Sequence, residues 1–146
     1  MGKSIIIKGA DFSINAIGVQ NLFNIADVRR NYAVLYNANT LTATIGAYDK
    51  LCVSGYIRIP ASATKIHVSG LHATGNIRYR FTTAQDDDEA TTENGILATA
   101  GVSEATVNVP SNSSYTYFSA TIYSGASAAA AASADLSNVS VEAIFS

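Results

Sequence analysis

One pattern occurs twice in this chain and constrains its fold more than any other feature. The first copy, residues 56–69, is an alternating run that ends at Pro60, then four small residues, then a second alternating run. The second copy, residues 106–119, repeats this order around Pro110. Alternation of apolar and polar residues is typical of a strand with one buried face, and proline, which has no N–H to donate, ends such a strand. Two such units predict two halves of a β-sandwich.

Most of the remaining chain also has strand patterns. Residues 32–36 and 41–48 predict a pair of strands around an Asn-Ala-Asn turn, because asparagine tolerates left-handed backbone. Gly46, inside the second of these strands, indicates a bulge or a close approach. Residues 77–81 alternate clearly and predict a central strand. Residues 139–145 alternate to the end of the chain and predict a closing strand.

Two segments have a weaker signal. Residues 22–28 carry apolar side chains every third position, which suits a short helix or a loop over the edge of the core. Residues 125–135 are almost entirely alanine and serine. Alanine is the best helix former, but a segment without larger apolar residues buries little surface, so we expect a short helix or a surface loop here.

The predicted fold is therefore all-β: a single-domain antiparallel β-sandwich of jelly-roll type, with about eight strands, over residues 1–146. A chain of 146 residues is long enough to bury a core of its own. The predicted core is Ile57, Ile59, Ile66, Val68, Ile77, Tyr79, Phe81, Val107, Val109, Phe118, Ile122, Val139, Val141 and Phe145.

Composition excludes several classes of function. The formal net charge is −2 and 14% of the residues are charged, so no basic surface for nucleic acid or anionic lipid is expected. No apolar run approaches the length of a membrane span, and the apolar part of the first eight residues is too short for a signal peptide. We therefore expect synthesis in the cytoplasm without a secretion signal. The single cysteine, Cys52, lies in an apolar run and is expected to be a buried small side chain.

The sharpest local signal is an acidic loop at residues 86–89. Calcium takes oxygen ligands from carboxylates and backbone carbonyls, which makes these side chains a candidate Ca²⁺ site. The spacing differs from an EF-hand, and consecutive side chains on extended backbone point in divergent directions, so a solvated acidic loop is the favoured interpretation. The candidate metal ligands are Asp86, Asp87, Asp88 and Glu89.

A row of tyrosines on the strand at 115–123 is the second candidate site. Alternation places Tyr115, Tyr117 and Tyr123 on one side together with Ser119 and Thr121. Aromatic rings stack on sugars while hydroxyls donate hydrogen bonds, so this face could bind a glycan. Alternating tyrosines are equally typical of a subunit interface or a half-exposed sheet, and the absence of tryptophan weakens the glycan interpretation.

Two arginines would add charged donors to this face if their strand is adjacent. Alternation points Arg78 and Arg80 outward, opposite to Ile77, Tyr79 and Phe81. The candidate ligand-binding residues are Tyr115, Tyr117, Tyr123, Arg78 and Arg80.

No enzyme pattern stands out. A glycosidase needs two carboxylates across a cleft, and here five of the eleven acids crowd the loop at residues 85–94 while the others are scattered on turns and strand ends. No nucleophile elbow, phosphate-binding glycine loop or metal-binding histidine spacing is present, and a catalytic role for Cys52 would need an oriented histidine. We therefore expect a protein without enzymatic activity.

Two short stretches resemble a known group of proteins. Residues 3–13, Lys-Ser-Ile-Ile-Ile-Lys-Gly-Ala-Asp-Phe-Ser, look like the opening of proteins from gut Bacteroidetes and their phages and prophages. In several of those proteins a strand-Gly-Tyr-x-x-(Val/Ile)-Pro-turn-strand unit follows, as residues 55–69 do here. The resemblance implies a jelly-roll-like sandwich and a virion or surface-attachment context. It carries no catalytic residues to transfer.

Together these observations predict a structural and attachment module of a virion or prophage, which docks to itself and to a cell-surface glycan or to other virion proteins. The alternative is a carbohydrate-binding module of a secreted or surface glycan-utilisation protein, located at the cell surface. A large apolar fraction and outward tyrosines favour a homo-oligomer, with a trimer as the first expectation from the resemblance. No cofactor is expected apart from the candidate Ca²⁺.

Overall fold

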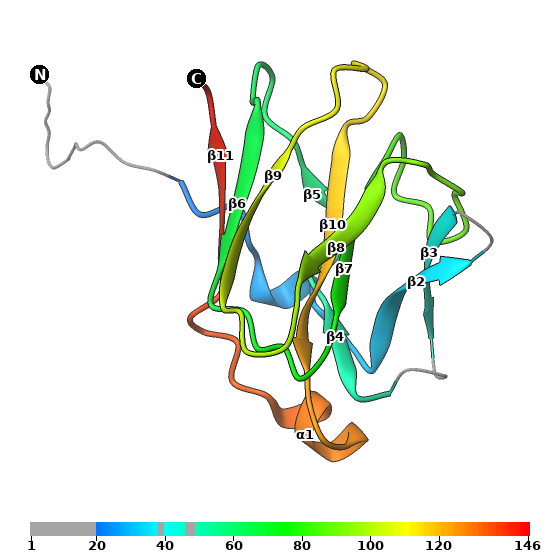
Figure 1. Cartoon of the computed structure of the whole chain (residues 1–146), viewed down its shortest axis with the longest axis vertical. Coiled ribbons are helices and arrows are strands. Elements are labelled where there is room, and N and C mark those ends of the chain that lie inside the picture. Colours follow the sequence, from blue (N-terminus) through cyan, green and yellow to red (C-terminus); the bar gives the residue numbers. More distant parts are fainter. Residues whose placement is uncertain (1–19, 38–39, 46–48) are drawn as a thin grey trace, which may run out of the picture.

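The computed structural model describes residues 20–37, 40–45 and 49–146 (Figure 1). At residues 35–37 and 40–45 it describes the backbone alone. Strands dominate the described residues, and the one α-helix, α1 (Ala128–Ser133), is short. The strands are β1 (Arg29–Arg30), β2 (Tyr32–Asn37), β3 (Thr40–Ile45), β4 (Leu51–Val53), β5 (Ile57–Arg58), β6 (Lys65–Ser69), β7 (Ile77–Thr82), β8 (Asn94–Ala98), β9 (Glu104–Asn108), β10 (Tyr117–Ser124) and β11 (Ser140–Ile144).

Two antiparallel sheets form the body of the molecule. The larger sheet has the order β1-β4-β10-β7-β8, and β5 pairs with β10 as well. The smaller sheet has the order β11-β6-β9, and a separate hairpin joins β2 to β3. The predicted all-β antiparallel sandwich is confirmed, while its jelly-roll type stays a prediction.

The core fills the space between the two sheets. Phe81 and Phe118 lie at its centre with ring centroids 5.4 Å apart, and Tyr79 packs edge-on against Phe81. Most of the predicted core residues are buried, and Ile59, Tyr79, Val107 and Val109 are partly buried against the same cluster. Phe145 is the exception, because its side chain is 60% exposed. It lies beyond Ile144, the last residue of β11 paired with β6, so no strand among the described residues covers it.

The two proline units do not each build one half of the sandwich. The first unit leaves the larger sheet at β5, turns after Pro60 and enters the smaller sheet at β6. The second unit runs the opposite way, from β9 through Pro110 to β10. Each unit is therefore a crossing between the two sheets.

The two crossings pair with each other in a reciprocal manner. The Ile59 N–H donates to the Thr116 carbonyl at 2.9 Å, and the corresponding Val109 N–H donates to the Thr64 carbonyl at 2.9 Å. The register continues this relation, because Ile57 pairs with Phe118 just as Val107 pairs with Ile66. The second turn is longer than the first, so the two units match in their strands and differ in their turns.

The hairpin β2–β3 covers part of the outer face of the larger sheet. The Val34 N–H donates to Thr121 Oγ1 at 3.3 Å, and Val34 packs with Val53 and Tyr32. Thr121 and Ser119, which alternation placed on an exposed tyrosine face, are 1% and 2% exposed, and Thr121 is the residue that this hairpin contacts. The prediction of one open aromatic and hydroxyl face on β10 is wrong, because a segment distant in the sequence lies over it.

The weaker segments fold locally. Residues 25–27 form a 3-10 turn capped by Asn24, whose Oδ1 accepts from the Ala26 N–H, and α1 confirms a short helix in the alanine-rich segment. The hairpin predicted from residues 32–48 is present, whereas its turn and Gly46 lie outside the described residues. None of the helices in the described part of the chain is long and apolar enough to cross a membrane.

Candidate functional site

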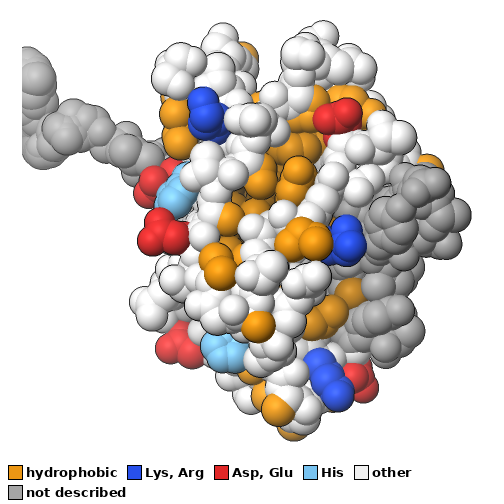
Figure 2. Space-filling model, in the orientation of Figure 1, with side chains coloured by type: hydrophobic (Ala, Val, Ile, Leu, Met, Phe, Trp, Pro, Cys, Tyr) orange, Lys and Arg blue, Asp and Glu red, His pale blue; other side chains and the backbone are white. Residues whose placement is uncertain are grey.

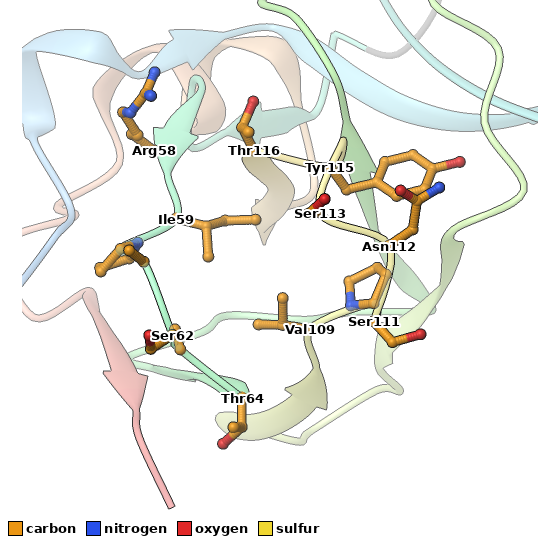
Figure 3. Close-up of a pocket in the computed structure, with 14 residues that line it drawn as sticks. Arg58, Ile59, Ser62, Thr64, Val109, Ser111, Asn112, Ser113, Tyr115 and Thr116 are labelled. Atoms are coloured by element: carbon orange, nitrogen blue, oxygen red, sulfur yellow. The ribbon is translucent and has the colours of Figure 1, made fainter.

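A cleft opens at the end of the sandwich where the two proline turns meet (Figure 3). It has a volume of about 840 Å³, and fourteen residues from the two crossings line it. They are Arg58, Ile59, Pro60, Ala61, Ser62, Ala63, Thr64, Val109, Pro110, Ser111, Asn112, Ser113, Tyr115 and Thr116. We call it the proline cleft. Because each proline ends its ladder, the chains diverge here and leave space between the two sheets.

The middle of the proline cleft is apolar. Ile59 and Val109, the residues before the two prolines, point toward each other across it (Figure 3). Their backbone N–H groups are bound by the opposite crossing, as described above, so both side chains are held at equivalent positions. In the space-filling view the upper half of the molecule is hollowed, and hydrophobic side chains lie at the bottom of the hollow (Figure 2).

The rim is polar and neutral apart from one arginine. Hydroxyl groups of serine and threonine come from both turns, and the longer second turn adds Asn112 and Tyr115 on one side (Figure 3). Asn112 shapes that turn, because its Oδ1 accepts from the Ser114 N–H at 3.0 Å and its carbonyl accepts from the Tyr115 N–H at 3.2 Å. The lining residues include no carboxylate, imidazole or thiol.

Arg58 points away from the middle of the cleft (Figure 3). It donates to the Tyr117 hydroxyl at 3.2 Å, and its guanidinium lies 5.7 Å from the centre of the Tyr117 ring. The Tyr117 hydroxyl also accepts a hydrogen bond from Gln85, and this bond together with the one from Arg58 lowers the pKa of Tyr117. Arg58 and Tyr117 therefore form one wall beside the cleft.

The three predicted tyrosines do not share one surface. Tyr115 lines the proline cleft, and Tyr117 lies beside it with Arg58. Tyr123 is near the other end of β10, where its ring stacks on His72 with centroids 4.9 Å apart. Only Tyr115 and Tyr117 could contact the same ligand.

Arg80 does not point into solvent as alternation predicted. Its side chain is 0% exposed, and it donates to the Glu89 carbonyl at 2.9 Å, the Asp86 carbonyl at 2.8 Å and the Tyr56 hydroxyl at 2.5 Å. The acidic loop folds over the outer face of β7 and buries this arginine. Arg78, on the same face, is half-buried and is not among the residues that line the cleft.

The acidic loop is held by hydrogen bonds to the rest of the chain. Asp87 accepts from Arg29 and, at 2.7 Å, from the Tyr56 hydroxyl. Burial opposes ionisation of Asp87, but the bonds from Arg29 and Tyr56 outweigh it and keep its pKa below the usual range. We call Arg29, Tyr56, Arg80 and Asp87 the outer-face cluster.

The other carboxylates of the loop are placed differently. Glu89 accepts from the backbone N–H groups of Thr83 and Ala84, and Asp86 Oδ1 accepts from the Asp88 N–H. Within the part of the chain that the structure describes, no group of three or more His, Cys, Asp or Glu residues is placed to hold a metal ion. Calcium binding by this loop stays a prediction without a gathered ligand set.

Sequence reasoning missed Tyr56, and the signal was present. Tyr56 belongs to the Gly-Tyr-x-x-Ile-Pro stretch, where it precedes β5 and anchors both Asp87 and Arg80. Gly55 has φ of +80°, and a Cβ there would lie 2.5 Å from the Asp27 carbonyl oxygen, so only glycine fits. The stretch is therefore a structural unit that ends at the proline cleft.

Comparison with protein-family models, with curated proteins and with solved structures finds no match for this chain.

Proposed function

We propose that this chain is a non-enzymatic attachment module that binds a saccharide in the proline cleft. One observation carries the proposal: an apolar middle, formed by Ile59 and Val109, lies below a rim of neutral hydroxyl and amide groups, and the aromatic side chain of Tyr115 stands on one side of this rim. Sugars present C–H faces that pack on apolar and aromatic groups, and hydroxyls that bond to such a rim. The lining residues include no acid or base to support turnover.

A glycan array with a matched pair of variants tests the proposal. Tyr115→Ala removes the aromatic wall of the cleft, whereas Tyr123→Ala removes the same side chain at the other end of β10. We expect binding by the wild type and by Tyr123→Ala, and its loss in Tyr115→Ala. Binding that survives in Tyr115→Ala, or no binding to any glycan at micromolar protein, would contradict a saccharide site in the cleft.

The sequence resemblance supports placing this module in a virion or prophage appendage that also docks to itself. Self-association, with three copies as the first expectation, predicts a mass that is a multiple of 15.2 kDa in light scattering. A mass of one chain at micromolar concentration would contradict self-docking without affecting the saccharide site.

The alternative function is a carbohydrate-binding module of a surface glycan-utilisation protein. In this alternative the saccharide binds in the same cleft, and the two proposals differ only in the kind of protein that carries the module. Capsid or tail genes next to the gene would favour the virion setting, and a glycan-utilisation cluster would favour the alternative.

A further inference from the structure

One charged side chain stands at the proline cleft. Arg58 is the charged member of the fourteen lining residues, and its side chain is exposed. Among the described residues no carboxylate forms an ion pair with Arg58. The cleft therefore combines a neutral rim with one cation that no described residue neutralises.

Arg58 differs from the arginines that support the fold. Arg29 forms an ion pair with Asp87, and the buried Arg80 donates to backbone carbonyls of the acidic loop. Arg58 donates from Nη1 to the Tyr117 hydroxyl, and in the described part of the chain its Nη2 and Nε donate to no group. A guanidinium has five N–H donors, so most of those on Arg58 remain for a ligand.

Tyr117 holds this arginine in place. The two residues are directly opposite in the pairing of β5 with β10, so their side chains share the outer face of the larger sheet. The Tyr117 ring is itself packed edge-on against Tyr56, with centroids 6.3 Å apart and an angle of 86° between the rings. A guanidinium that is already held loses less conformational entropy when it binds, so Arg58 is prepared for an anionic partner.

The Tyr117 hydroxyl adds a further donor to the same wall. Its oxygen accepts from Gln85 Nε2 at 3.5 Å and from Arg58 at 3.2 Å, so its own O–H is left to donate. The same two bonds lower the pKa of Tyr117, which makes its O–H a stronger donor. Arg58, Gln85 and Tyr117 thus gather hydrogen-bond donors at one wall of the cleft. A group that carries negative charge and accepts several hydrogen bonds fits such a wall.

The acidic loop follows Gln85, but its carboxylates bind other groups. Asp87 accepts from Arg29 and from Tyr56. Glu89 accepts from the backbone N–H groups of the two residues before Gln85. Neither carboxylate is paired with the arginine of the cleft. An anionic group of a ligand therefore does not have to displace a carboxylate of the chain.

We propose that the saccharide bound in the proline cleft is acidic, and that Arg58, oriented by Tyr117, binds its anionic group, a carboxylate or a sulfate. This inference rests on the saccharide site proposed above. Arginine binds such oxyanions through two parallel hydrogen bonds. The cleft, with its volume of about 840 Å³, has room for more than one sugar ring. A ring packed over Ile59 and Val109 then extends its acidic substituent toward Arg58, on the side of the cleft opposite to Asn112 (Figure 3).

Matched glycans on an array test this preference in the full chain. The probes are a neutral oligosaccharide, the same oligosaccharide with a terminal sialic or uronic acid, and the same oligosaccharide with a sulfate ester. The wild type should bind one acidic form at least about fivefold more tightly than the neutral parent, and the form that it prefers distinguishes carboxylate from sulfate. Equal binding of neutral and acidic forms would overturn the inference and leave the saccharide site in place. No binding to any probe would contradict both.

Variants that remove one positive charge test the role of the arginine. Arg58→Gln should abolish the preference, so that acidic and neutral forms bind alike, and Arg58→Lys should retain part of it because the charge remains without the planar fork. The matched control is Lys50→Gln, at the other end of β10, where the Lys50 carbonyl accepts from the Gly125 N–H. The control should keep the preference. Equal losses in Arg58→Gln and Lys50→Gln would assign the effect to net charge and overturn the proposal.

Salt and the tyrosine hydroxyl provide two further measurements. Raising the NaCl concentration from about 0.05 to 0.5 M should weaken binding of the acidic form more than binding of the neutral form, because salt screens an ionic contact at the surface. Tyr117→Phe, which keeps the ring and removes the hydroxyl, should shift the preference toward that of Arg58→Gln. A preference for the acidic form that does not change with salt would overturn an ionic contact with Arg58. A preference that is unchanged in Tyr117→Phe would overturn the orienting role of Tyr117.

Discussion

The outer-face cluster and the proline cleft both hold polar side chains, but they use them in different ways. In the cluster each of the four side chains binds another group of the same chain, as Tyr56 does when it donates to Asp87 and accepts from Arg80. In the cleft the rim residues Ser111 and Asn112 are exposed and surround an apolar middle. The charged residues thus support the fold, and the neutral residues after the prolines remain available to a ligand.

The difference shows that a conspicuous run of charged residues in a sequence does not by itself mark a binding site. The acidic run was the most conspicuous local feature, yet its Asp87 and Glu89 bind arginine, tyrosine and backbone N–H groups. The proline turns consist of ordinary small residues, and they form the cleft because two of them meet. Four variants or conditions test this contrast, beginning with the largest expected effect.

Arg80→Ala should lower the free energy of unfolding by about 3 kcal/mol, because it removes a fully buried cation and leaves the Asp86 and Glu89 carbonyls without a donor. Urea denaturation measures the loss. The control is Arg78→Ala, two residues away on the same face of β7, with an expected loss of less than about 1 kcal/mol. Equal losses would mean that burial of Arg80 does not matter for stability.

Tyr56→Phe should cost about 1.5 kcal/mol, because the hydroxyl bonds to a carboxylate and to a guanidinium. Its matched control is Tyr117→Phe, whose hydroxyl bonds to Arg58 at the surface, and for which we expect a clearly smaller loss of stability because solvent screens an exposed bond. A larger loss of stability in Tyr117→Phe than in Tyr56→Phe would mean that the Arg58–Tyr117 wall also supports the fold, which would contradict the difference between the cleft and the outer-face cluster.

Acid should destabilise the protein through Asp87. The pKa of this carboxyl is lowered in the folded state, so its contribution is fully present above the unfolded value of about 4 and is lost as the pH falls through the folded value. Melting temperatures of the wild type and of Asp87→Asn should therefore differ at pH 6 and converge toward pH 2.5. A constant difference across this range would exclude ionisation of Asp87 as the cause.

Ser111→Ala should have the smallest effect on the fold, with a change within about 0.5 kcal/mol, because the side chain is exposed on the rim. If the cleft binds a saccharide, the same variant weakens binding, which titration calorimetry measures on any glycan identified by the array. A loss of stability as large as that of Tyr56→Phe would instead assign the rim a supporting role.

The alternation of apolar and polar residues correctly predicted the features that depend on one short segment of the sequence. Strands such as β7 and β11 lie where alternation placed them, and each proline ends its ladder. The prediction that Phe145 belongs to the core was wrong, because alternation gives the face of a residue but not the point where the opposing strand stops. The prediction that Arg80 is exposed was wrong, because a loop covers its face and the alternation within β7 contains no information about that loop.

The proline cleft could be predicted only in part. Both units were visible in the sequence, but their meeting depends on the pairing of β5 with β10 and of β6 with β9. Two strands with similar patterns can pair in many ways, and the side chains of one strand do not specify its neighbour. Tyr115 was found as part of a row of tyrosines, while its placement in the cleft follows from the length of the second turn.

The reciprocal pairing of the two crossings has a consequence for folding. Closing them requires residue 57 to meet residue 118 and residue 66 to meet residue 107, and such contacts, distant in sequence, cost loop entropy before they stabilise anything. Neither crossing can form its pairs without the other. We therefore expect the cleft to assemble in the same slow, cooperative step as the sandwich, so a peptide that contains one turn alone would have no binding site.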